Sequence, residues 1–118
     1  MGGRQFVAWF LICEVALFAL ASLAHGGRLL SGYEHVRAAI AEAVTAGVLA
    51  VGLVAFLALP RLARRIALGV QTFALVGVLA GLVAVALGMG SQSTPDLILH
   101  GAMILVLLMG LLLTLRSH

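Results

Sequence analysis

The chain has 118 residues, of which 64% are hydrophobic and 9% are charged, and its mean hydropathy is +1.23. Soluble domains carry about 25% charged residues, so this composition excludes a water-soluble globule, and about 20 apolar residues per crossing leave room for about four or five membrane helices but for no soluble active site. The net charge of +3 comes from seven scattered arginines against four carboxylates, whereas nucleic-acid binding needs a contiguous basic face, so a nucleic-acid partner is also excluded.

Four apolar runs, in chain order, predict four transmembrane helices at about residues 5–24, 37–59, 65–89 and 96–115. Each run is long enough to cross a hydrocarbon core of about 30 Å at about 1.5 Å per residue. Glycine, proline, serine and arginine residues punctuate the breaks between the runs. We therefore expect an all-α, antiparallel four-helix membrane bundle, with residues 1–118 forming a single membrane domain.

The first run also resembles a signal peptide, because Arg4 precedes an apolar stretch that ends in the small-residue sequence Ala19-Leu20-Ala21. Its apolar stretch is longer than the about 7–15 residues of a signal-peptide core, which favours a retained helix. Cys13 lies inside this run and is the only cysteine, so an intramolecular disulfide and a multi-cysteine metal site are both excluded.

Small residues on the second and third runs predict close helix contacts, since glycine and alanine let backbones approach in a membrane. Ala43 and Gly47 form one such pair, and Gly77 and Gly81 form another. The fourth run has the clearest start, in the sequence Thr94-Pro95-Asp96. It predicts Thr94 as the N-cap residue, a proline in the first turn and a carboxylate that is favoured by the helix dipole.

The arginines near the predicted helix ends indicate the orientation of the chain. Five of them lie on the side of the two termini: Arg4, Arg61, Arg64, Arg65 and Arg116. The opposite side carries only Arg28 and Arg37. Because positive residues concentrate on the cytoplasmic side, we expect both termini to be cytoplasmic and the loops 25–36 and 89–95 to face outward. This pattern predicts a multi-pass protein of a bacterial inner membrane, in contact with the lipid bilayer.

Ionisable residues at membrane depth are the most informative, since each costs about 2.5–3.5 kcal/mol or more at the bilayer centre. Glu14 is the deepest, about 15 Å from either end of its helix. Eleven residues separate it from His25, which places the two on nearly the same helix face. Glu14 is therefore a candidate proton-carrying or transport carboxylate. Near the membrane interfaces, we expect four side chains to contact solvent or lipid headgroups: Arg28, Glu34, Arg37 and His118.

A second group of ionisable residues is predicted near the outer interface. His35 and Glu42 are seven residues apart on one face of the second helix, and Asp96 and His100 are four apart on one face of the fourth. Glu42 and His100 have similar depth, so a compact bundle favours their pairing across the second and fourth helices. We expect His25 or His35 to close over this pair.

Imidazole and carboxylate are ligands that Zn, Fe, Mn and Cu accept, and four-helix bundles often hold metals or cofactors between facing helices. His25, His35 and His100 with Glu42 would supply a ligand set. Asp96 would accept a hydrogen bond from one of the ligand imidazoles without contacting the metal. A transition metal or a haem is therefore one expectation, although the paired Glu-x-x-His motif of di-iron bundles is missing. The same residues also fit a buried Glu–His hydrogen bond, a proton relay or a quinone-type pocket.

No nucleophile with a neighbouring base is visible, which favours a role other than that of an enzyme. A chain with so little mass outside the bilayer also fits an accessory subunit of a larger membrane complex, a homo-oligomer or a purely structural subunit.

The length, the four helices and the sequence Cys13-Glu14-Val15 resemble the small multidrug resistance transporters. This resemblance covers only the first helix. It implies that Glu14 exchanges protons for cationic substrates, in antiparallel dimers.

A second resemblance covers most of the chain. Its features are similar to those of small four-helix bacterial membrane proteins that carry no assigned function. The matching features are His25 with the following glycine-rich loop, Ala39-Ile40-Ala41-Glu42, Gln71 to Leu75 with Gly77 and Gly81, and Pro95-Asp96 with His100. This resemblance implies the architecture and a bacterial origin, and it implies no activity.

Overall fold

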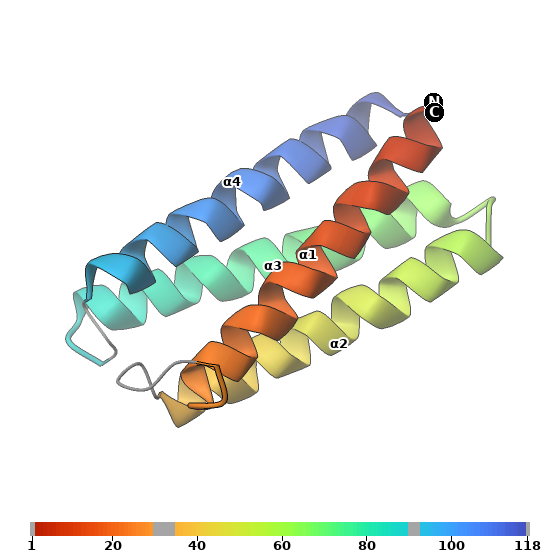
Figure 1. The fold of residues 1–118 in the computed structure, drawn as a ribbon. Helices are drawn as coiled ribbons and strands as arrows, with labels where there is room; N and C mark the ends of the chain where they lie inside the picture. The colour runs from red at the N-terminus through yellow and green to blue at the C-terminus, as the bar shows by residue number, and fades with distance from the viewer. Residues whose placement is uncertain (1, 30–34, 90–92, 118) are drawn as a thin grey trace.

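The computed structural model describes residues 2–29, 35–89 and 93–117. Four long helices account for most of these residues, which confirms the predicted all-α four-helix bundle (Figure 1). In chain order the helices are α1 (Gly3–His25), α2 (Val36–Ala58), α3 (Ala63–Ala86) and α4 (Thr94–Arg116). Each has 23 or 24 residues, so each is long enough to cross a bilayer.

The helices pack as an elongated bundle with extents of 43 × 24 × 20 Å. α1 packs against α2 and α4, and α3 packs against the same two helices, so α1 and α3 lie on a diagonal of the bundle (Figure 1). The two termini lie at the same end, where a Cβ atom added to Gly3 would be 3.6 Å from Ser117 Cβ. We call this the terminal end of the bundle and the opposite one the loop end.

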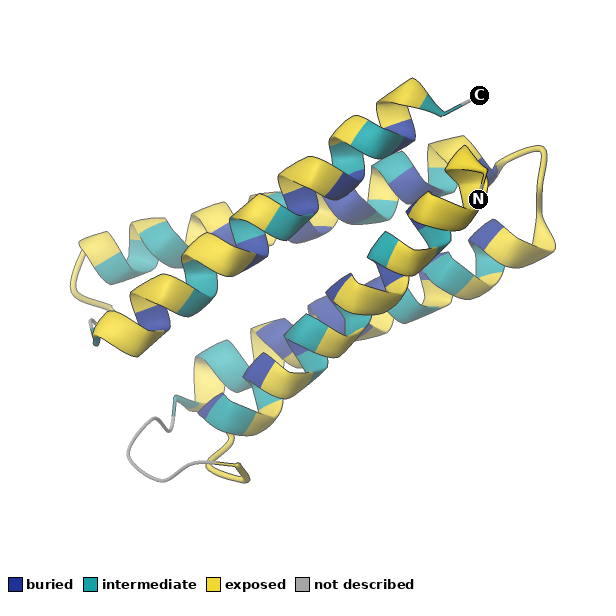
Figure 2. Ribbon diagram, turned by 45° about the horizontal axis from the view of Figure 1, so that its top comes forward, coloured by how far each residue is buried: buried dark blue, intermediate teal, exposed yellow. Residues whose placement is uncertain are grey.

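The bundle is apolar on its outside as well as in its interior. Buried positions form a narrow stripe along each helix and face the bundle axis (Figure 2). Large apolar side chains cover the outside, as at Val36 and Val51, which are 70% and 71% exposed. The most apolar window of each helix has a mean hydropathy of 2.2 to 2.5. Such an outer surface is suited to lipid, so the chain is a multi-pass membrane protein.

The helix ends lie within one to three residues of the predicted ones, and two of them show why. The N-cap residue of α4 is Ser93 and not Thr94, because it is the Ser93 hydroxyl that accepts from the backbone N–H of Asp96, at 3.4 Å. Pro95 lies in the first turn, as predicted. α3 ends at Ala86, before the predicted end at residue 89, and Gly88 follows with a φ of +80°. That left-handed backbone is typical of a helix end and is adopted most readily by glycine.

Glycine allows close helix contacts, and the tightest are at positions that were not predicted. Cβ atoms on the predicted Gly77 and Gly81 would lie at ordinary contact distances, 3.9 Å from Thr45 Oγ1 and 3.8 Å from His100 Nε2. A Cβ atom on Gly52 of α2 would lie 2.6 Å from a methyl group of Val70 on α3. Gly110 of α4 is equally restricted, by polar side chains described below. The predicted pair Ala43 and Gly47 is exposed, and Gly47 has no neighbour within 4 Å among the described residues. That prediction is therefore wrong for contacts within this bundle.

Arginines at the terminal end have a structural role that their sequence pattern did not indicate. The Arg4 side chain donates to two carbonyl oxygens in the last turn of α2, at 3.1 and 3.3 Å. The Arg64 side chain donates to two carbonyl oxygens in the last turn of α4, at 3.3 and 2.9 Å. The last carbonyls of a helix have no partner within the helix, and they carry the negative end of its dipole. Both arginines therefore cap a neighbouring helix.

Candidate functional site

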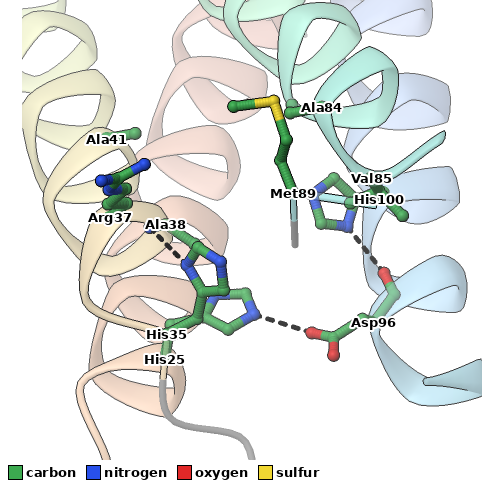
Figure 3. A pocket seen from close by; sticks show the side chains of 11 residues that line it. His25, His35, Arg37, Ala38, Ala41, Ala84, Val85, Met89, Asp96 and His100 are labelled. Atoms are coloured by element: carbon green, nitrogen blue, oxygen red, sulfur yellow. Dashed lines mark hydrogen bonds and ion pairs between the residues drawn. The ribbon is translucent and has the colours of Figure 1, made fainter. Parts of the chain in front are cut away.

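Three buried ionisable side chains meet at the loop end of the bundle. His25, the last residue of α1, places Nδ1 2.9 Å from Glu42 Oε2 and 2.8 Å from Glu42 Oε1 on α2. Its Nε2 atom lies 2.7 Å from Asp96 Oδ1 on α4 (Figure 3). The three residues are 3%, 7% and 4% exposed, respectively. We call this group the triad; it joins three of the four helices.

Local hydrogen bonds fix the positions of the triad residues. The Ser93 hydroxyl lies 2.6 Å from Asp96 Oδ2, so the cap of α4 also holds the carboxylate. The Ser22 hydroxyl on α1 donates to the carbonyl of Ala39 on α2, at 2.7 Å. The backbone N–H of His35 donates to the carbonyl of His25, at 2.7 Å. The ends of α1 and α2 are thus joined through the backbone and through side chains.

The hydrogen bonds define how many protons the triad holds. Each ring nitrogen of His25 faces a carboxylate oxygen, and each of these two contacts requires one proton. Either both protons are on the imidazole, or one is on the imidazole and the other on a carboxyl group. In both arrangements two carboxyl groups and one imidazole share two protons, so the net charge of the triad is −1. A buried excess charge of this kind favours a further proton or another cation close by.

Two cavities adjoin the triad. The outer cavity, of about 190 Å³, is lined by the triad residues His25 and Asp96, with the exposed Arg37 among its other lining residues (Figure 3). The inner cavity, of about 90 Å³, is lined by Glu42 and extends to Thr45. His100 lines both cavities. His100 therefore adjoins both the cavity at the loop end and the cavity on the deeper side of the triad.

His100 does not pair with Glu42 as the sequence analysis predicted. Its Nδ1 atom donates to the backbone carbonyl of Asp96 in its own helix, at 2.7 Å. Glu42 instead hydrogen-bonds to His25, although Glu42 and His100 line the same inner cavity. The predicted link between α2 and α4 therefore exists, but it runs through an imidazole of α1.

His35 has a role that the sequence analysis did not predict. It is the N-cap residue of α2, and its Nδ1 atom accepts from the backbone N–H of Ala38 at 3.0 Å. Its ring lies edge-on to the ring of His25, with 6.5 Å between the centroids. His35 thus lies beside the triad through its ring contact with His25, while its Nδ1 atom caps α2.

The predicted metal-ligand set does not converge in this structure. Among the described residues, no group of three or more histidine, cysteine or acidic side chains is arranged to hold a metal ion. Metal ligands must point at one centre, whereas Glu42 and Asp96 approach opposite nitrogens of the His25 ring. The outer cavity of about 190 Å³ is also smaller than the about 300–1,000 Å³ of pockets for drug-sized ligands, so a haem does not fit there.

A second polar group lies in the middle of the bundle, around Glu14. Its carboxyl group is fully buried, and both oxygens lack a hydrogen-bond partner among the described residues. Gln71 Nε2 on α3 also lacks one, although a Cβ atom on Gly110 would touch both it and Glu14 Oε1, so the two groups face the same gap. On its other side, Gln71 Oε1 lies 3.2 Å from the hydroxyl of Thr114. The apolar residues Phe18 and Ala21 separate Glu14 from His25 along the buried face of α1.

Sequence patterns identified Glu14 but not its neighbours Gln71 and Thr114. Neutral polar residues are common enough in membrane helices that neither residue stands out without knowledge of the helix rotation. Of the four predicted surface residues, Arg28 and Arg37 are exposed, and Glu34 and His118 lie outside the described residues.

Comparisons with known proteins add no family to this description: no family model, curated protein or solved structure matches the chain. The resemblance to the small multidrug resistance transporters therefore rests on the first helix alone. The function has to be argued from the geometry of the triad and of Glu14.

Proposed function

We propose that this chain is a proton-coupled membrane protein, in which the triad takes up and releases protons through the outer cavity. The observation that supports this function best is the double contact of His25, whose two ring nitrogens face buried carboxylates of two other helices. Histidine and acidic residues kept inside a membrane bundle commonly belong to proton relays or ion pathways. The triad combines both kinds of group with a cavity at the loop end.

A purely structural triad would also join α1, α2 and α4. The adjoining cavities favour proton exchange over such a lock, because a lock is most stable when it is tightly packed and sealed. His100 supports this interpretation, since it lines both cavities. Its Nε2 atom faces Gly81, where a Cβ atom would lie only 3.8 Å away. An imidazole there is suited to passing protons between the outer cavity and Glu42.

The arginine distribution supports the direction of this exchange. The five arginines of the terminal end favour the cytoplasmic side of a bacterial inner membrane, which would place the triad near the outer surface. Protons would then enter from outside. An oligomeric state or a partner complex stays a prediction from chain size.

A second candidate function uses Glu14 as the transport carboxylate of a proton-coupled cation exporter. The fully buried carboxyl group, which faces the neutral amide of Gln71, supports it, since a carboxylate in that position requires a proton or a cation as its counter-charge. The apolar layer at Phe18 and Ala21 separates this group from the triad. The two functions therefore predict that substitutions of different residues abolish activity.

Proton flux into proteoliposomes tests the proposal. A potassium gradient with valinomycin drives protons inward, and a trapped pH-sensitive dye reports them. We expect flux above that of protein-free liposomes for the wild-type protein. Since Gln and Asn cannot take up the additional proton, His25→Gln and Asp96→Asn should lower the flux to the protein-free background. The matched control is His35→Asn, which removes a neighbouring imidazole but keeps an efficient N-cap residue, so its flux should stay at the wild-type value.

Other outcomes would support a structural role of the triad or the second candidate function instead. If His25→Gln lowers the unfolding midpoint in detergent but leaves the flux unchanged, the triad is a structural lock and the proposal is wrong. If only Glu14→Gln abolishes flux, the second candidate function is correct. The absence of flux from the folded wild-type protein would contradict the first proposal, and its absence also with a cationic substrate trapped inside the liposomes would contradict the second.

A further inference from the structure

A third cavity, of about 330 Å³, lies at the terminal end, away from the triad and from Glu14. Four arginines line it: Arg4, Arg61, Arg64 and Arg65. Ser117 and Pro60 also contribute to its wall. Its volume falls in the range of about 300–1,000 Å³ that is common for ligand pockets.

The positive charge of this cavity is only partly used by the protein. Arg4 and Arg64 donate to helix carbonyls, as described above. Arg61 and Arg65 are exposed, and within the part of the chain that the structure describes neither makes a hydrogen bond or an ion pair. Of the four acidic residues of the chain, Glu14 lies in the middle of α1, Glu42 and Asp96 lie at the loop end, and Glu34 lies outside the described residues. Among the described residues, no carboxylate side chain therefore neutralises these two arginines.

The start of α3 adds to the positive potential. This helix begins at Ala63, between the two unpaired arginines, with no side-chain cap and no acidic residue in its first turn. The N-terminus of a helix carries partial positive charge and free N–H groups, both of which favour an anion. The apolar side chains of Leu59 and Leu62, 48% and 45% exposed, lie in the same connection. A phosphate with attached acyl chains matches this combination of charge and apolar surface.

We propose that this cavity binds the phosphate group of an anionic phospholipid. Arginine is suited to this ligand, because its planar guanidinium presents a fork of N–H donors to phosphate oxygens. Basic pockets at the ends of membrane helices lie at the depth of the lipid headgroups. The inference is independent of proton exchange at the triad. A soluble phosphate shares the same recognition chemistry, so the experiment includes it.

Lipid binding is measured on the full chain, purified in a neutral detergent and titrated with phosphatidylglycerol, phosphatidylcholine or inorganic phosphate. Native mass spectrometry counts the bound molecules. We expect phosphatidylglycerol to bind more tightly than phosphatidylcholine. Each arginine near a lipid phosphate contributes about fivefold in affinity, so Arg61→Gln with Arg65→Gln should weaken phosphatidylglycerol binding about 25-fold.

The matched control is Arg28→Gln with Arg116→Gln, which removes the same charge from two arginines that do not line the cavity. It should leave the affinity near the wild-type value. Arg4 and Arg64 are not substituted, because they cap helix ends, whereas Arg61 and Arg65 are exposed and their loss should leave the unfolding midpoint unchanged.

Three results would overturn the proposal. Equal binding of phosphatidylglycerol and phosphatidylcholine would mean that the cavity does not recognise an anionic lipid. An equal loss of affinity in the control variant would mean that overall charge, and not this cavity, attracts lipid. Binding of inorganic phosphate, but not of phosphatidylglycerol, with the same sensitivity to Arg61 and Arg65 would identify a soluble anion as the ligand.

Discussion

Gly110 is the residue on which the polar centre of the bundle depends. The absence of a side chain there leaves the gap that Glu14 and Gln71 share, because a Cβ atom would overlap Glu14 Oε1 and lie 3.2 Å from Gln71 Nε2. All of these atoms are inside the bundle. The bundle thus accommodates a carboxyl group at this depth because residue 110 has no side chain and because the amide of Gln71 lies at the same gap.

Gly110→Ala should therefore destabilise the protein, although alanine is the better helix former. We expect a loss of about 1–3 kcal/mol in the free energy of unfolding, the usual range for overpacking in a tight core. Titration with a denaturing detergent, followed by circular dichroism, measures it.

The matched control is Gly47→Ala, which meets nothing within 4 Å among the described residues and should be neutral or stabilising. Shortening the opposing side chain should restore stability, so Gly110→Ala combined with Glu14→Ala should be more stable than Gly110→Ala alone. If the double variant is less stable than either single variant, then crowding at Gly110 is not the cause.

At the scale of helices, the two arginine caps show how charge and packing are combined. Arg4 lies in the first turn of α1 and contacts the end of α2, and Arg64 lies in the first turn of α3 and contacts the end of α4. Each cap joins the start of one helix to the end of an adjacent antiparallel helix. The Arg4 guanidinium also lies 5.4 Å from the centre of the Phe56 ring, which adds a cation–π contact.

Arg64→Met should expose the end of α4, since methionine keeps the apolar stem but loses the donors. We expect a loss of about 1 kcal/mol in the free energy of unfolding and faster amide exchange in the last turn of α4. Hydrogen exchange with mass spectrometry measures the second effect. Arg61→Met removes the same charge from a residue without a partner among those described, so it should leave the exchange of α4 unchanged. Equal exchange in both variants would mean that Arg64 is not a cap.

Helix positions were predictable, and helix contacts only in part. Long apolar runs determined the four spans, because a bilayer requires a fixed length of apolar helix. Spacing placed Glu14 and His25 on the buried face of α1, as the structure has them. Spacing does not define which neighbouring helix a face meets, so Glu42 was assigned to His100 although its partner is His25. The N-cap of α4 was misplaced because Ser93 and Thr94 are adjacent and chemically equivalent caps.

At the scale of the whole molecule, the orientation in the membrane can be measured directly. Leu29→Cys and Ser117→Cys, each in a Cys13→Ala background, place single thiols at opposite ends of the bundle. We expect a membrane-impermeant maleimide to label Leu29→Cys in intact cells and Ser117→Cys only after permeabilisation, because five of the seven arginines lie at the terminal end. The reverse labelling would invert the orientation. Labelling of both thiols in intact cells would indicate dual topology.

α3 stands apart from the other helices at the loop end. The triad takes its side chains from α1, α2 and α4, whereas α3 presents Gly77, Gly81 and Ala84 to the two cavities. These three residues have no side chain longer than a methyl group, and Val78 and Val85 complete the apolar wall that α3 forms beside the triad. At the other end, Val70 presses into Gly52 and Arg64 binds α4. Because α3 contributes no side chain to the triad, larger side chains at Gly81 or Ala84 would reduce the cavities while leaving the hydrogen bonds of His25 with Glu42 and Asp96 in place.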